Sequence, residues 1–182
     1  AGAVKQVGST LLSVGKDALD SYADYEQLVG GVETLFKDNA STVENYANNE
    51  PARPFASEII NKLKNEGNSI YIITARSADK WDDVDGQMNN VVKIWLEHNG
   101  VNYDKLIFSK EKLEICEKYN IDIMIEDKTE NINSISKSLP VICFHENHNK
   151  ELKGKNIYRA YSWYDVYYQY LIIKEALKND KN

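Results

Sequence analysis

Four short apolar segments of the chain end in residues that could together hold a phosphate group and a divalent cation. A hydroxyl can donate a hydrogen bond to a phosphate oxygen, an ammonium group can neutralise charge that develops in phosphoryl transfer, and carboxylate oxygens suit Mg²⁺. Residues of all three kinds follow the apolar segments 69–74, 105–109, 121–127 and 140–144. In chain order, the residues at these ends are Thr74, Ala75, Arg76, Ser109, Lys110, Lys112, Glu126, Asp127, His145 and Glu146.

The apolar segments have the composition of buried parallel strands. Each is short, continuously apolar and bounded by polar residues, as expected where helices cover both faces of a sheet. A fifth segment of this kind covers 156–160. Helical patterns lie before, between and after the segments, over 55–67, 87–100, 111–120, 130–139 and 162–178. The alternation predicts an α/β fold with a doubly wound parallel sheet, in which ligands bind beyond the carboxyl ends of the strands.

Signals at the ends of the helical patterns support this division of the chain. Gly67 and Gly100 are placed to end two of the helices. Ser162 and Asp165 have the spacing of a capping box and predict the start of the last helix.

Residues 1–49 follow a different pattern from the rest of the chain. Their apolar residues recur at spacings of three and four, which is typical of amphipathic helices, and glycines interrupt the pattern. We therefore expect a small helical cap over 1–49 and an α/β core over 50–182. A strand over 9–14 is the alternative for part of this segment.

Length, charge and cysteine content limit the class of protein. With 182 residues the chain suits one α/β domain with a small helical insertion, and its net charge of −6 argues against binding to a nucleic acid polymer. No apolar run could span a bilayer, and no basic and then apolar leader opens the sequence. Cys116 and Cys143 lie in apolar surroundings and are expected to be reduced core thiols. We expect a soluble cytoplasmic protein, and the sequence sets no oligomeric state.

Three segments, in this order, resemble motifs of the haloacid dehalogenase (HAD) superfamily of phosphohydrolases. IYIITAR resembles the second motif, SKEKLEICEKYNID the third and IMIEDKTENI the fourth. The similarity covers about residues 48–170 and is greatest to the 5'(3')-deoxyribonucleotidase group, whose pattern also includes YSWYDVY. The resemblance implies a HAD-like Rossmannoid fold and Mg²⁺-dependent hydrolysis of a phosphate monoester. It also implies a small phosphorylated substrate, a nucleoside monophosphate.

The resemblance also implies roles for the residues at the strand ends. Thr74 would bind the transferring phosphoryl group, and Lys112, or Lys110 in its place, would bridge phosphate and nucleophile. Asp127, helped by Glu126, would complete the Mg²⁺ site. The residues expected to contact the substrate are Ala75, Arg76 and Lys110.

The first motif of that superfamily is not found. It is an apolar strand ending in Asp-x-Asp-Gly, whose first Asp attacks phosphorus. The sequence DVDG at 83–86 follows ADKWD rather than an apolar strand, so we interpret it as a loop or a helix start. Asp17 and Asp20 lie three residues apart, which places both on one helix face. The nucleophile stays unassigned, and the alternative function is a catalytically silent HAD-like protein that binds a phosphorylated ligand or a protein partner.

Two further polar groups border the expected site. His145 and His148 in HENHN suggest zinc, but without a properly spaced third ligand they favour a polar loop at the edge of the site. Arg53 could reach the substrate or anchor the connection between cap and core. The aromatic segment 158–170 has helical spacing and is expected to pack the last helix on the sheet rather than to stack on a nucleobase.

Overall fold

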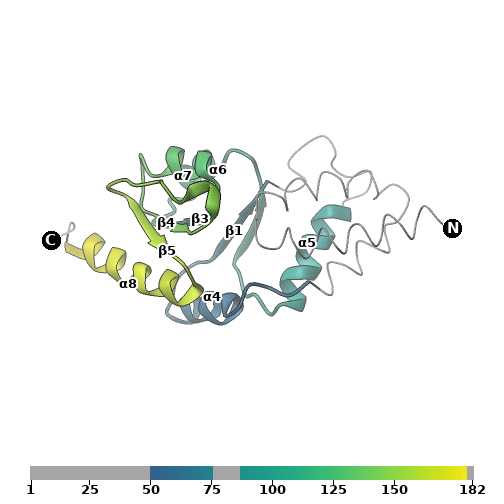
Figure 1. Ribbon diagram of the computed structural model, residues 1–182. Helices are drawn as coiled ribbons and strands as arrows, with labels where there is room; N and C mark the ends of the chain where they lie inside the picture. Colours follow the sequence, from purple (N-terminus) through teal and green to yellow (C-terminus); the bar gives the residue numbers. More distant parts are fainter. Residues whose placement is uncertain (1–49, 76–86, 180–182) are drawn as a thin grey trace.

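The computed structural model describes residues 50–75 and 87–179 (Figure 1). The expected cap, the strand over 9–14, Asp17, Asp20, Arg76 and the DVDG segment all lie outside these residues. The described elements, in chain order, are α4 (Ala56–Asn65), β1 (Tyr71–Thr74), α5 (Gln87–His98), β2 (Lys105–Phe108), α6 (Lys112–Lys118), β3 (Met124–Glu126), α7 (Thr129–Ile135), β4 (Val141–Phe144), the 3₁₀ helix η1 (Asn147–Asn149), β5 (Ile157–Ala160) and α8 (Trp163–Asn179). The predicted order of strands and helices is confirmed.

The strands are parallel, as predicted, and form two sheets. β1 pairs with β2 so that Tyr71 lies opposite Lys105 and Thr74 lies opposite Phe108. The other sheet has the order β3-β4-β5. Within residues 50–75 and 87–179, β1 and β3 each pair with a strand on one side only.

Helices cover both faces of the three-stranded sheet because the side chains of β4 alternate between two apolar layers. Val141 and Cys143 pack on one face with apolar residues of α6 and α7, such as Cys116 and Ile132. Ile142, one residue out of phase, packs on the opposite face with α4 and α8. Figure 1 shows these two pairs of helices on opposite sides of β3–β5. The doubly covered α/β prediction is thereby confirmed.

The two-stranded sheet has its own apolar layer. Val92 and Leu96 of α5 are buried with Val101, and Ile72 and Leu106 of the two strands pack against them. The next residue along β1, Ile73, lies instead in the layer that contains Cys116, Met124 and Ile132. β1 therefore contributes to both layers, and it links the half that holds α5 to the half that holds β3–β5.

Residues in the left-handed backbone region end three helices. Gly67, Gly100 and Asn120 have φ values of 89°, 64° and 50° and follow α4, α5 and α6. At α5, the Gly100 N–H donates to the Glu97 carbonyl at 3.0 Å and the Val101 N–H donates to the Leu96 carbonyl at 2.9 Å. These two bonds form a Schellman motif, which satisfies carbonyls that the helix itself leaves unpaired. The roles predicted for Gly67 and Gly100 are confirmed.

The last helix begins as the sequence predicts. The Asp165 N–H donates to Ser162 Oγ at 3.1 Å, and Asp165 Oδ2 accepts from the Tyr161 N–H at 3.0 Å. Along α8, Val166, Tyr170 and Ile173 are buried against the sheet. The tyrosines Tyr161, Tyr164 and Tyr168 are exposed, so only part of the aromatic segment packs as expected.

The expectations for the cysteines and for membrane helices can be compared with the described residues. Cys116 and Cys143 are both buried and free, and burial raises the pKa of each thiol. Reduced core thiols are therefore confirmed. In the part of the chain that the structure describes, the helices lack the length and apolar character that crossing a membrane requires.

Candidate active site

An ion pair joins the segment after β2 to the carboxyl end of β3, and a backbone hydrogen bond joins the carboxyl ends of β1 and β2. The Ser109 N–H, just after β2, donates to the Thr74 carbonyl at the end of β1 at 2.8 Å. Three residues later, Lys112 begins α6, and its Nζ lies 2.7 Å from Glu126 Oε2 at the end of β3. The topology thus brings together side chains that are 14 residues apart along the chain.

Glu126 is held as a buried carboxylate with several hydrogen-bond donors. It is 5% exposed, and its Oε1 accepts from the backbone N–H groups of Asp127 at 3.2 Å and Lys128 at 3.0 Å. Burial alone would raise the pKa of Glu126. The Lys112 charge and these hydrogen bonds outweigh burial, so the pKa of Glu126 lies below its usual range. Glu126 therefore stays ionised and keeps Lys112 in place.

Asp127 has the opposite electrostatic environment. Burial and the neighbouring negative charge of Glu126 raise the pKa of Asp127 from 3.8 to about 6. A cation beside the Asp127 carboxylate would offset both effects.

The fit of these residues to Mg²⁺ depends on how many protein ligands the ion needs. Within residues 50–75 and 87–179, no group of three or more His, Cys, Asp and Glu side chains is arranged to hold a metal ion. Mg²⁺ keeps several waters and commonly takes only one or two carboxylates, with substrate phosphate as a further ligand. Glu126 already accepts from Lys112 and from backbone N–H groups, whereas the Asp127 carboxyl shares a hydrogen bond with the like-charged Glu126, which a cation could replace. Asp127 is therefore the residue here that suits Mg²⁺.

The structure brings some of the predicted site residues together. Lys112, Glu126 and Asp127 form one cluster, and Thr74 lies at the adjacent strand end through its bond to Ser109. Ala75 follows Thr74 and is partly buried, whereas Lys110 is exposed. Arg76 lies outside the described residues. The catalytic, substrate-binding and metal-binding roles of these residues stay predictions.

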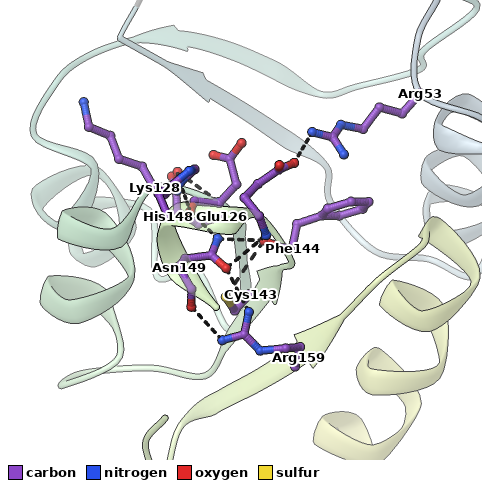
Figure 2. Close-up of polar contacts among 10 residues, drawn as sticks. Arg53, Glu126, Lys128, Cys143, Phe144, His148, Asn149 and Arg159 are labelled. Atoms are coloured by element: carbon purple, nitrogen blue, oxygen red, sulfur yellow. Dashed lines mark hydrogen bonds and ion pairs between the residues drawn. The ribbon is translucent and has the colours of Figure 1, made fainter. Parts of the chain in front are cut away.

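A residue that the sequence did not single out lies beneath this cluster. Asn149, at the end of η1, is fully buried, and its Nδ2 donates to the Asp127 carbonyl at 2.6 Å. His148 Nε2 also lies 3.0 Å from that carbonyl. Figure 2 shows Asn149 between Arg159 and the segment that carries Glu126 and Lys128. Asn is common in loops, so its residue type gave no signal that this one would be buried.

The two histidines of HENHN do not share a site. His148 faces the Asp127 carbonyl, whereas His145 Nδ1 lies 3.3 Å from Arg159 Nη1 and its ring packs on Tyr161 at 4.8 Å between centroids. The segment is a polar loop beside the candidate site, and these contacts give no support to a zinc centre.

Arg53 anchors the segment that precedes α4. Its guanidinium forms an ion pair with Glu146, in the loop after β4, and lies over the Phe144 ring at 4.6 Å from the centroid. Of the two alternatives for Arg53, these contacts favour the anchoring role. Figure 2 shows Arg53 reaching towards the loop that follows Phe144.

Comparison with known proteins identifies the family. The family described as 5' nucleotidase, deoxy (pyrimidine), cytosolic type C protein (NT5C) matches residues 22–177. The chain belongs to this family. The match includes the three HAD-like motifs and begins within the segment that the apolar pattern set apart as a cap. The recognition of a HAD-like nucleotidase family is confirmed.

Two curated relatives agree with this assignment. One, from Chlorobaculum tepidum, is named "Putative 5'(3')-deoxyribonucleotidase" and is 34% identical over 117 residues, which cover 64% of this chain and 54% of the relative. The other, from Bacillus subtilis, is named "Putative nucleotidase YqfW" and is 27% identical over 115 residues, which cover 61% of this chain and 55% of the relative. The chain thus spans about half the length of these relatives. No solved structure is significantly similar to the chain.

Proposed function

We propose that this chain carries the phosphate site of a nucleotidase that hydrolyses the phosphate monoester of a deoxyribonucleoside monophosphate. Water enters, the ester oxygen leaves with a proton as the nucleoside hydroxyl, and inorganic phosphate is released. The carrying observation is the Lys112 ammonium, held 2.7 Å from buried Glu126 and beside Asp127 at the carboxyl ends of parallel strands. Family membership and the names of the two relatives support the same reaction class.

The environments of the residues at these strand ends support a role for each in the proposed reaction. Lys112 would neutralise charge that develops on the phosphoryl oxygens, and Glu126 would hold the ammonium in position. The Thr74 hydroxyl would donate to a phosphate oxygen. Asp127 would hold Mg²⁺, which when bound supplies further charge neutralisation at the phosphate. The attacking carboxylate stays unassigned in this proposal.

Phosphate release from a panel of 5' and 3' deoxyribonucleoside monophosphates, with Mg²⁺ present, tests the proposal. Lys112→Met should lower kcat/KM by about 100-fold or more, because the charge that faces the phosphate is lost. Lys118→Met, at the exposed end of the same helix, is the matched control and should stay within about twofold of the wild type.

A double variant separates catalysis from folding. Lys112→Met leaves Glu126 buried without its partner, which should cost about 3–5 kcal/mol of stability. Lys112→Met with Glu126→Gln removes both charges and should recover much of that stability while activity stays lost. Activity that returns with stability would contradict the catalytic role of Lys112. Binding of phosphate or nucleotide by a wild-type chain that never releases phosphate would instead favour the silent HAD-like alternative.

A further inference from the structure

Asn149 is a buried hub between the candidate site and the strands behind it. Its Nδ2 donates to the carbonyls of Asp127 at 2.6 Å and Phe144 at 2.9 Å. Its Oδ1 accepts from the Glu146 N–H at 3.1 Å and from Arg159 Nη1 at 2.8 Å. Both donor hydrogens and both acceptor positions of the amide are therefore used. These contacts tie together the ends of β3 and β4, the loop after β4, and β5.

The partners of Asn149 leave its amide a single orientation. Two carbonyl oxygens face Nδ2, and an N–H group and a guanidinium face Oδ1, so a flipped amide would lose all four bonds. Arg159 is itself fixed, because its Nη2 donates to the carbonyls of Asn149 at 2.9 Å and Leu152 at 2.8 Å. Hydrogen bonds from a charged guanidinium are stronger than those between neutral groups. The amide therefore presents Nδ2 to Asp127 at a fixed position.

A fully buried amide is not needed to fill this space. Asn149 is 0% exposed, and an apolar side chain could occupy this space without having to satisfy four polar positions. Fully satisfied networks of this kind rigidify a site and restrict it to one arrangement. This network restricts the main chain at Asp127. The Asp127 carbonyl contacts both Asn149 Nδ2 and His148 Nε2.

We propose that Asn149, braced by Arg159, is a positioning residue that fixes the main chain of Asp127 and so aims its carboxylate at a divalent cation. This inference rests on the proposed function, in which Asp127 holds that cation. Mutation of a residue that hydrogen-bonds to a metal ligand commonly lowers metal affinity by about 10–100-fold. Asn149 acts through its hydrogen bond to the backbone carbonyl of Asp127 and not through contact with substrate or metal.

The test compares Asn149→Leu with Asn156→Leu in the full chain. Asn156 is the matched control because its Nδ2 also donates to a backbone carbonyl, that of Ser136 at 2.9 Å, but at the end of α7. Hydrogen exchange of the Asp127–Thr129 amides, without metal, reports on the main chain. Binding of Mn²⁺ without substrate, followed by electron paramagnetic resonance, reports on the aim of the carboxylate. Both are measured well below the melting temperature of each variant.

Asn149→Leu should speed exchange of these amides and weaken Mn²⁺ binding by about 10-fold or more. Asn156→Leu should stay within about twofold of the wild type in both, even where it lowers the melting temperature as much. His148→Ala, at an exposed position, should fold in any case and weaken Mn²⁺ binding by a smaller factor. If Asn149→Leu does not fold, Mn²⁺ binding by His148→Ala tests the positioning role in its place.

Three outcomes would overturn the positioning role. One is Mn²⁺ binding by Asn149→Leu, or by His148→Ala where only that variant folds, equal to the wild type. The second is equal weakening in Asn156→Leu. The third is a wild-type chain that binds no Mn²⁺. A wild-type chain that binds Mn²⁺ but releases no phosphate would end the nucleotidase proposal and leave the positioning role to be decided by binding alone.

Discussion

Asp127 and Glu126 are adjacent carboxylates with opposite electrostatic environments. Lys112 and backbone N–H groups hold the pKa of Glu126 low against the effect of burial, whereas burial and the charge of Glu126 raise the pKa of Asp127 to about 6. Neighbouring groups whose pKa values are driven apart are typical of sites that bind or transform ligands. This contrast supports different roles for the two residues: Glu126 holds Lys112 in position, and Asp127 binds a ligand.

The raised pKa of Asp127 predicts how stability changes with pH when no metal is present. A carboxyl with a higher pKa in the folded chain stabilises that state fully below 3.8, and the contribution is lost as pH rises through about 6. Asp127→Asn removes this dependence. Between pH 4 and pH 7, the wild type should therefore lose up to about 3 kcal/mol relative to Asp127→Asn.

Urea unfolding in EDTA at a series of pH values measures this difference. Asp122→Asn, an exposed aspartate before β3, is the control and should follow the wild-type profile. If the wild type and Asp127→Asn lose the same stability between pH 4 and pH 7, Asp127 is not the source of the pH dependence.

At the scale of elements, the helix ends set where each strand begins. Gly100 ends α5 with φ 64°, and a Cβ added there would meet nothing within 4 Å. The residue is therefore required for its backbone conformation alone, since the left-handed region is unfavourable for residues with a Cβ. The chain then turns into the segment that leads to β2.

Two substitutions at Gly100 separate conformation from packing. Gly100→Ala should lower the free energy of unfolding by about 1–2 kcal/mol, because alanine pays the full left-handed cost. Gly100→Asn should cost less, because asparagine tolerates this region, as Asn120 does at the end of α6 with φ 50°. Chemical denaturation measures both, and equal losses would indicate a packing effect.

At the scale of the whole molecule, the three-stranded sheet separates two apolar layers. Ile132 of α7 is fully buried in one layer, and Ile173 of α8 is buried at 1% exposure in the other. The two layers lie on opposite faces of the sheet, and the two side chains belong to separate clusters of buried residues. The layers should therefore contribute separately to stability.

The variants Ile132→Val and Ile173→Val test that separation. Each should cost about 0.5–1.5 kcal/mol, and the double variant should cost their sum within about 0.5 kcal/mol. The free energy of unfolding from urea titrations gives the three values. A clear departure from additivity would show that the sheet transmits strain between its faces.

The amino-acid sequence determined the order and type of the described elements. Short segments buried on both faces, such as 141–144, are continuously apolar. Gly67 and Gly100 act through local backbone geometry, and Ser162 acts through a hydrogen bond three residues along the chain. The same locality made Thr74, Lys112, Glu126 and Asp127 visible as polar residues at strand ends. Their roles as site residues stay predictions.

Only the tertiary structure decided which polar groups share partners. It pairs Lys112 with Glu126 across 14 residues, leaves Asp127 beside a like charge, and turns Arg53 to Glu146 across 93 residues. Asn149 shows the physical reason most clearly. Its importance lies in contacts with residues 22 positions before and 10 after it, and no local pattern of hydrophobicity or spacing records such contacts.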